Sequence, residues 1–195
     1  MVTVTLLIII VIVSAIGLSS RRLLEWAMLR PYAVARGSGY ATLVTSGFIH
    51  ADVGHLVLNL ITFYSMGFGL ERVIGTGRFL GLYFCGLLIS ALASCLKHRN
   101  DPHYATLGAS GAISAVLFAA IVYFPSSRLV IFPLPIPIPA PLFAVGYLGV
   151  SYYMSRTSRA RINHDAHIAG ALTGLAFVSA TDPRAIENLL AYFTG

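Results

Sequence analysis

Five polar side chains interrupt the apolar stretches of this sequence, and together they have the chemistry to attack a carbonyl group. They are His50, His55, Asn59, Ser110 and His167. Polar side chains are costly inside a bilayer and mark functional sites by default. A neutral imidazole can take the hydroxyl proton of a serine while the serine oxygen attacks a carbonyl carbon. Ser110 and His167 are therefore a candidate nucleophile and general base.

The negative charge that develops on the attacked oxygen needs hydrogen-bond donors. The unpaired N–H groups at the start of the helix that Ser110 opens, with its positive dipole end, are candidates. His55 and Asn59 are four residues apart, so they lie one turn from each other on one helical face and can add two donors. His50 falls about 140° around that helix from His55, or in its entry, so we expect it to have a different task.

A third, acidic member of this set is not evident. Asp165 is only two residues from His167 and lies on the opposite side of a helix, so it cannot orient that ring. Asp52 and Asp101 lie in connectors and remain open candidates. A serine–histidine dyad is the simpler interpretation. Taken singly, a serine at a helix start is ordinarily an N-cap, and a histidine near a span end is ordinarily an interface residue.

Two stripes of small residues can bring the serine and the histidine together. One stripe follows His167 through Gly170 and Gly174, and the other consists of Ser110, Gly111, Ser114 and Ala115. Small residues at helical spacing let two helix backbones approach closely in a membrane. If these two helices pack, Ser110 and His167 lie near their first turns on the same side of the membrane.

Composition indicates a polytopic helical membrane protein. Hydrophobic residues make up 57% of the 195 residues and charged residues only 10%, whereas soluble domains carry about 25% charged residues. We expect an all-α fold in one membrane domain, 1–195, with spans near residues 2–18, 53–70, 79–96, 105–124, 140–155 and 166–180. The second, fourth and sixth spans then enter from one side, which lets the five polar groups converge. The net charge of +6 suits anionic lipid headgroups and requires no nucleic acid.

Three segments qualify this picture. The first span resembles a signal peptide, but it lacks a basic region before its apolar run, so we expect an uncleaved span. Residues 132–141 carry proline at every second position, which predicts an extended connector before the fifth span. Residues 192–195 and those just before them are expected to form a frayed tail.

In the light of these residues, the chain from about 45 to 180 resembles the rhomboid intramembrane serine proteases. The motifs that carry the resemblance occur in the family's order. They are His-x4-His-x3-Asn (His50, His55, Asn59), Glu-x3-Gly-x-Gly (Glu71, Gly75, Gly77), Gly-x-Ser-Gly (Gly108, Ser110, Gly111) and Ala-His-x2-Gly-x3-Gly (Ala166, His167, Gly170, Gly174). Each motif alone is weak, whereas the ordered combination is specific.

The resemblance implies a role for each of these residues. Ser110 would be the nucleophile and His167 the general base, while His55, Asn59 and the Ser110 N–H would bind the oxyanion. His50 would support the first connector, and the motif glycines Gly108, Gly111, Gly170 and Gly174 would support the site. The family cleaves transmembrane proteins and uses no metal or cofactor. We expect a multi-pass protein of a bacterial inner or plasma membrane, of unknown oligomeric state.

Two departures from the family pattern concern the surroundings of the site. The Trp-Arg pair that usually precedes the first histidine is missing, and Tyr40 and Thr42 stand in that loop. An aromatic residue commonly follows the serine by four positions and packs on the catalytic ring, but here that residue is Ser114. In addition, the excess of Lys and Arg in the first, third and fifth connectors favours an inward-facing site, against the family's orientation.

Other function classes remain as alternatives. A catalytically inactive rhomboid-like protein that binds membrane clients would usually lack the serine or the histidine. A membrane metalloprotease would need His55, Asn59, His164 and His167 as ligands, yet no His-Glu-x-x-His is present. A transporter or channel is disfavoured because no chain of carboxylates crosses the spans.

Overall fold

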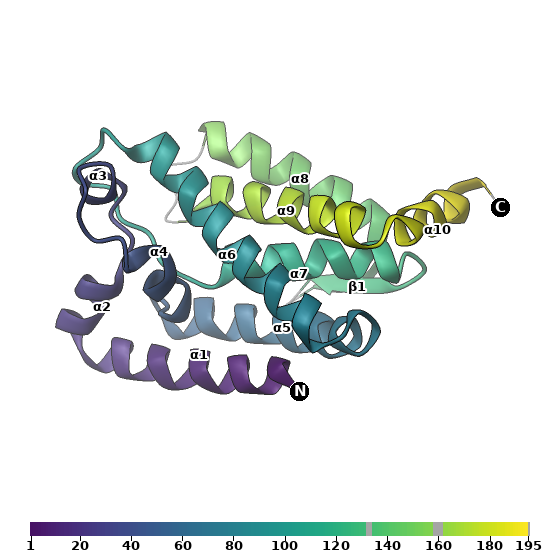
Figure 1. Ribbon diagram of the computed structural model, residues 1–195, viewed down its shortest axis with the longest axis horizontal. Coiled ribbons are helices and arrows are strands. Elements are labelled where there is room, and N and C mark those ends of the chain that lie inside the picture. The colour runs from purple at the N-terminus through teal and green to yellow at the C-terminus, as the bar shows by residue number, and fades with distance from the viewer. Residues whose placement is uncertain (132–133, 158–161, 195) are drawn as a thin grey trace.

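The computed structural model describes residues 1–131, 134–157 and 162–194 of the chain (Figure 1). The elements are α1 (Val2–Ser19), α2 (Arg21–Ala27), α3 (Pro31–Val34), α4 (Thr42–Thr45), η1 (Ser46–Phe48), α5 (Val53–Ile74), α6 (Thr76–His98), α7 (Ser110–Tyr123), β1 (Arg128–Ile131), β2 (Leu134–Pro139), α8 (Ala140–Thr157), α9 (His164–Thr181) and α10 (Pro183–Thr194). The expected all-α fold is confirmed, with one two-stranded sheet as its only strands among the described residues.

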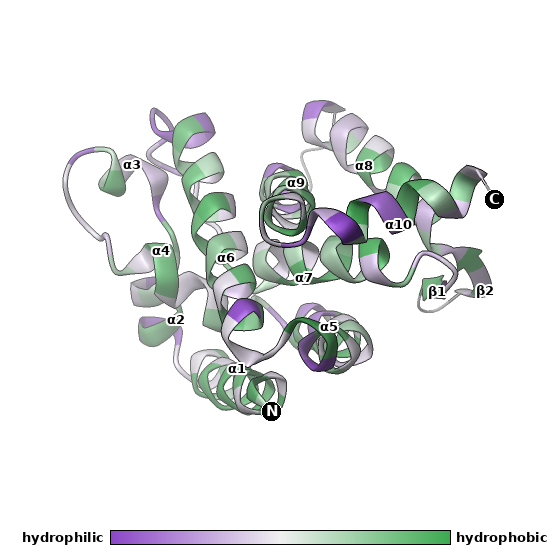
Figure 2. Cartoon of the chain, turned by 45° about the vertical axis from the view of Figure 1, so that its right-hand side comes forward, coloured by the Kyte–Doolittle hydropathy of each residue, from purple (hydrophilic) through white to green (hydrophobic). Residues whose placement is uncertain are grey.

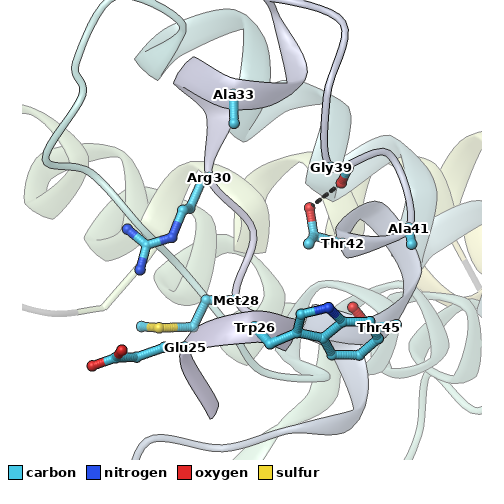
Figure 3. A pocket seen from close by; sticks show the side chains of 9 residues that line it. All are labelled: Glu25, Trp26, Met28, Arg30, Ala33, Gly39, Ala41, Thr42 and Thr45. Carbon is cyan, nitrogen blue, oxygen red and sulfur yellow. Dashed lines mark hydrogen bonds between the residues drawn. The ribbon is translucent and has the colours of Figure 1, made fainter. Parts of the chain in front are cut away.

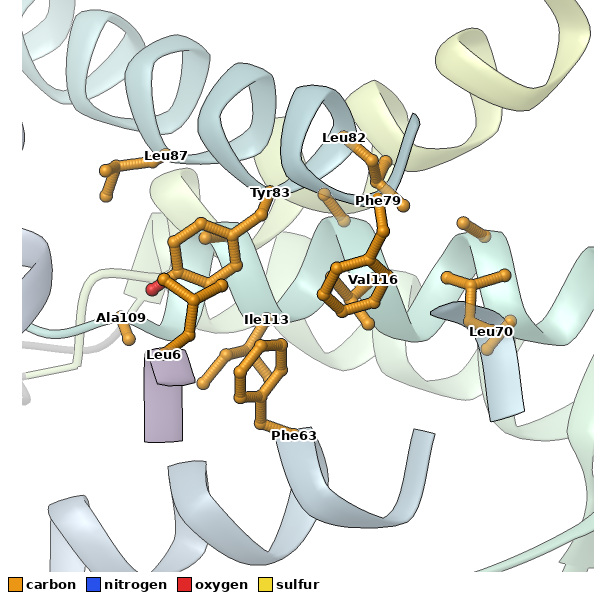
Figure 4. Close-up of a cluster of buried hydrophobic side chains, with 14 of the residues drawn as sticks. Leu6, Phe63, Leu70, Phe79, Leu82, Tyr83, Leu87, Ala109, Ile113 and Val116 are labelled. Carbon is orange, nitrogen blue, oxygen red and sulfur yellow. The ribbon is translucent and has the colours of Figure 1, made fainter. Parts of the chain in front are cut away.

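The helix that begins at Ser110, α7, forms the centre of the bundle. It packs against α5, α6 and α9, and residues 111–122 are all buried. A helix that is apolar on every side is stable only when it is surrounded. On one side Phe63, Phe79 and Tyr83 of α5 and α6 form an aromatic cluster against it, with ring centroids 5.4–6.0 Å apart (Figure 4).

Three of the helices are long and apolar enough to cross a membrane. Among the described residues these are α1, α5 and α6, and α7 is a shorter apolar helix. The helix α7 begins at Ser110, the residue expected to open it, although the expected span 105–124 starts five residues earlier. The reason is Gly108, whose φ of 119° lies in a region that glycine favours and that a helix cannot contain.

The carboxylate of Glu71 joins α1 to the end of α5. It accepts hydrogen bonds from the backbone N–H groups of Val2 (2.8 Å) and Thr3 (2.9 Å). It also accepts bonds from the hydroxyls of Thr3 (2.7 Å) and Thr76 (2.9 Å). Glu71 is only 3% exposed, so all four donors depend on this one buried group.

The change Glu71→Gln should lower the free energy of unfolding by about 3 kcal/mol, because hydrogen bonds to charged groups contribute about 1.5–3 kcal/mol each. The side-chain nitrogen of the glutamine is a donor, and it would point at donor groups where the glutamate oxygen accepts their hydrogen bonds. Thermal unfolding in detergent measures the loss. The matched control is Glu187→Gln on the exposed face of α10, which should leave the midpoint unchanged. Equal midpoints for both variants would contradict the role given to Glu71.

The proline-rich segment is extended, as predicted, but it is also paired. Residues 134–139 form β2, which runs antiparallel to β1 with Arg128 opposite Pro139 and Val130 opposite Pro137. Residues 132–133, which belong to the predicted connector, lie outside the described part of the chain. The hairpin lies at the end of the bundle opposite α2–α4 (Figure 1).

The prediction of a frayed tail was wrong. Residues 183–194 form α10, which has a hydrophilic and a hydrophobic face (Figure 2). Ala185 is buried, and Ile186 and Leu189 pack against the main core. Pro183 suits the first turn of a helix because the N–H that it lacks would be unpaired there. The Asp182 carboxylate just before it accepts a hydrogen bond from the Tyr123 hydroxyl at 2.9 Å.

Candidate active site

Ser110 and His167 meet at the ends of two adjacent helices. Ser110 is the first residue of α7, and His167 lies in the first turn of α9. The distance from Ser110 Oγ to His167 Nε2 is 2.8 Å, which is within hydrogen-bond range. The structure thus brings together the two residues that the sequence proposes as nucleophile and base.

The close approach of α9 to α7 depends on glycines. A Cβ atom at Gly170 would collide with the carbonyl oxygen of Gly111, and one at Gly174 would collide with the carbonyl oxygen of Ala115. A Cβ atom at Gly111 would in turn collide with Ser90 of α6. Backbone therefore packs directly on backbone here, which holds the His167 turn of α9 against the start of α7.

The first turn of α9 is also fixed by its N-cap. The Asn163 side-chain oxygen accepts a hydrogen bond from Ala166 N–H at 3.1 Å. Its amide nitrogen donates to the hydroxyls of Ser94 (2.7 Å) and Thr106 (3.3 Å). This cap, which the sequence reasoning did not single out, ties the turn that carries His167 to α6 and to the loop before Ser110.

His50 is fully buried behind the nucleophile. Its Nδ1 lies 2.8 Å from the hydroxyl of Ser14, which itself donates to the carbonyl of Phe48 at 3.0 Å. The backbone N–H of Ala109 points to His50 Nε2 at 3.5 Å. These contacts fit a neutral ring that donates through Nδ1 and accepts through Nε2. Burial lowers the pKa of His50 to about 4, which agrees with a neutral ring at pH 7.

His55 and Asn59 line the same end of α5, one turn apart. The His55 ring packs against Gly108, where a Cβ atom would lie 2.7 Å from its Cε1, so only glycine fits beneath the ring. The Asn59 Nδ2 donates to the carbonyl of His55 at 3.0 Å and retains a second N–H. Their part in binding an oxyanion stays a prediction.

The three candidate acids are engaged elsewhere. Asp52 is the N-cap of α5 and accepts a hydrogen bond from His55 N–H at 2.8 Å. Asp165 forms an ion pair with Lys97. Asp101 accepts a hydrogen bond from His103 N–H at 2.9 Å. These contacts favour a dyad over a triad.

The connector between α1 and α5 is anchored without the expected Trp-Arg pair. Leu29 and Thr106 exchange two backbone hydrogen bonds of 2.9 and 3.0 Å, which attach this connector to the loop before Ser110. Tyr40, by contrast, is 60% exposed. The connector also contains a hollow of about 230 Å³, lined in part by Trp26 and Arg30 (Figure 3). That hollow includes neither member of the dyad.

Tyr147 of α8 is a neighbour of the dyad that the sequence reasoning missed. Its ring lies 6.1 Å from the His167 ring at an angle of 22°, and its hydroxyl lies 2.8 Å from Ser114 Oγ. The serine at position 114 was the available signal, because it leaves space for an aromatic side chain from another helix.

The described residues include no group of three His, Cys, Asp or Glu side chains that could hold a metal ion. His164 and His167 have ring centroids 5.9 Å apart and meet edge to face. Around Ser110 lie the ring nitrogen of His167, at 2.8 Å from its hydroxyl, and the ring of His55, which packs on Gly108.

The sequence of this chain is similar to a family model and to several known proteins. A family model described as Rhomboid domain matches residues 37–181. The mitochondrial RHOMBOID-like protein 12 of Arabidopsis thaliana is 30% identical over 145 residues, or 67% of this chain and 43% of that protein. Rhomboid protein 1, mitochondrial, of Saccharomyces cerevisiae is 26% identical over 163 residues, with coverages of 78% and 46%. Rhomboid protease GluP of Bacillus subtilis is 29% identical over 141 residues, with coverages of 72% and 26%.

These relatives differ from the chain in length, and two of them are named for an organelle. The chain spans less than half the length of each of these three relatives. The plant and yeast relatives are named as mitochondrial proteins. These names contradict the expectation of a bacterial inner or plasma membrane, while the multi-pass membrane character remains consistent with the helices described above.

Proposed function

The chain belongs to the rhomboid family, and from this premise we propose that it is an intramembrane serine endopeptidase. Proteins of this family act on or associate with membrane proteins. Our proposal is that this chain hydrolyses peptide bonds in or near transmembrane segments of other proteins. The observation that carries it is the 2.8 Å contact between Ser110 Oγ and His167 Nε2.

The proposed reaction has two stages. Ser110 Oγ attacks the scissile carbonyl carbon while its proton passes to His167 Nε2. The same nitrogen then gives this proton to the departing amine nitrogen, the C–N bond breaks, and an ester to Ser110 remains. In the second stage water attacks the ester carbon while His167 takes a proton from it. The bond between this carbon and Ser110 Oγ then breaks, Oγ recovers the proton from His167, and the carboxylic acid product leaves.

In both stages the tetrahedral intermediate carries a negative oxygen that needs donors. The Ser110 N–H stands at the positive end of α7 and has no partner within its own helix. His55 and the second N–H of Asn59 are the proposed side-chain donors. Donors that are already in place stabilise the developing charge without reorganisation.

The changes His55→Ala and Asn59→Ala should each lower kcat about 10²–10³-fold, because each removes one oxyanion donor. The value of KM should change little, since the oxyanion forms only after binding. Initial rates on a fluorogenic transmembrane peptide in detergent give both constants. The control Asn188→Ala changes an exposed asparagine of α10 and should keep the wild-type rate. Wild-type kcat in both site variants would exclude the assigned donors.

A fluorophosphonate probe tests the proposed function directly. The purified protein should be labelled at Ser110, as located by peptide mass spectrometry, and Ser110→Ala and His167→Ala should not be labelled. Cleavage of a transmembrane substrate should persist in a chelator. A folded wild-type protein that neither reacts with the probe nor cleaves would instead support the alternative, an inactive rhomboid-like protein that binds membrane clients.

We also propose that the protein resides in a mitochondrial membrane, because two of its relatives carry that location in their names. Fractionation followed by carbonate extraction of the membranes tests this placement. Recovery of the protein in the carbonate-resistant mitochondrial pellet is expected, and its recovery in another membrane fraction would contradict the proposal.

A further inference from the structure

Tyr147 of α8 contacts Ser114 on α7, and its ring also lies beside the ring of His167 on α9. The residue that it contacts on α7, Ser114, lies one turn after Ser110 and is 3% exposed. Residues four apart lie on the same helical face. The helix that presents the nucleophile therefore also holds the hydroxyl of Tyr147, while the Tyr147 ring lies beside that of His167.

We propose that Tyr147 is a positioning residue, which holds the His167 ring in the orientation needed to take the proton of Ser110. This inference rests on the proposed function. The contact with Ser110 holds the imidazole at Nε2, and the His164 ring meets it edge to face. A nearly parallel ring at 6.1 Å limits rotation of the imidazole about its side-chain bonds.

Tyr147 can serve as such a support because it is itself held on two sides. Its hydroxyl is fixed by Ser114 at 2.8 Å. Its ring packs against Phe118 of α7 and Phe143 of α8, with centroids 5.5 and 5.8 Å away. A tyrosine with both ring and hydroxyl engaged has few rotamers left, so it forms a stable wall beside the base.

The contact makes the dyad depend on the position of α8. This helix lies beside α9 (Figure 1) and has only Ala140 and Ser151 buried among its 18 residues. Most of its surface is therefore not committed to the bundle. Tyr147 is thus held beside His167 by a helix that the bundle buries only in part.

Kinetics of position 147 variants test the proposal. The change Tyr147→Ala should lower kcat about 10²-fold, the order of loss that follows from misplacing a reacting group, with KM nearly unchanged. Tyr147→Phe keeps the ring and loses only the bond to Ser114, so its kcat should fall about fivefold. Ser114→Ala should lower kcat by a similar factor. The double variant of Tyr147→Phe and Ser114→Ala should be no slower than either single variant.

A transposed aromatic side chain separates positioning from general packing. In the Tyr147→Ala background, the added change Ser114→Tyr places an aromatic ring beside His167 from α7 and should restore kcat at least tenfold. The control Tyr153→Ala removes a tyrosine of the same helix that is 64% exposed and should leave kcat unchanged.

The kcat and KM of these variants distinguish a positioning role of Tyr147 from its alternatives. Loss of kcat in Tyr147→Ala with recovery in the double variant supports the proposal. Wild-type kcat in Tyr147→Ala, or a raised KM with unchanged kcat, overturns it while the proposed function stands. If Tyr147→Ala does not fold, the double-mutant cycle of Tyr147→Phe and Ser114→Ala decides. Losses of kcat that add in free energy in the double variant would exclude the coupling between the Tyr147 hydroxyl and Ser114, and would overturn the proposal. A wild-type protein without any cleavage would instead overturn the proposed function itself.

Discussion

Ser110→Ala and His167→Ala should each lower kcat by at least about 10⁴-fold, and the double variant should be no slower than either single one. A nucleophile and its base act as one unit, so removal of either stops the covalent step. Among the described residues, the three aspartates considered as a third member are engaged in a cap, an ion pair and a turn. The residual rate should come from the oxyanion donors and substrate binding alone.

The measurement compares initial rates for the three variants and the wild type on one transmembrane substrate in detergent. Thermal unfolding should show that the variants remain folded, because Ser110 and His167 each lose only one hydrogen bond. Losses that multiply in the double variant would mean that the two residues act independently. Such a result would argue against a dyad.

The contact between the proposed nucleophile and base could be predicted because its signals are local. His55 and Asn59 share a helical face by spacing alone, and the small residues after Ser110 and His167 indicate two helices that approach closely. The structure adds a further constraint on the turn of α9 that carries His167. That constraint is the Asn163 cap, whose partners Ser94 and Thr106 are distant in sequence.

The features that escaped prediction depend on pairs of residues that no local pattern connects. Prolines predict the extended backbone of residues 134–139, but its pairing with Arg128–Ile131 is set by the register of the hairpin. Tyr147 and His167 are on different helices, and their contact follows from how α8 lies on α9. The span that contains α7 was drawn from residue 105, because hydropathy does not report the positive φ of Gly108.

The change Gly170→Val should abolish activity as completely as loss of His167 does. A side chain at this position meets the backbone carbonyl of Gly111, and a helix backbone cannot yield as a flexible side chain does. The two helices must then separate, and the bond between Ser110 and His167 is broken. Since misplacement of a reacting group by 1 Å already costs about 10²-fold, the larger separation should reduce cleavage about 10⁴-fold.

The matched control is Gly149→Ala on α8, where an added Cβ atom meets nothing within 4 Å. That change should leave the rate intact and stabilise the helix by up to about 1 kcal/mol. The smaller change Gly170→Ala should fall between these two, because a single methyl group still collides with Gly111 but demands a smaller shift. If Gly170→Val cleaved at the wild-type rate, the backbone contact of α7 and α9 would not position the dyad. The ring support from Tyr147 and the Asn163 cap would then have to position His167 on their own.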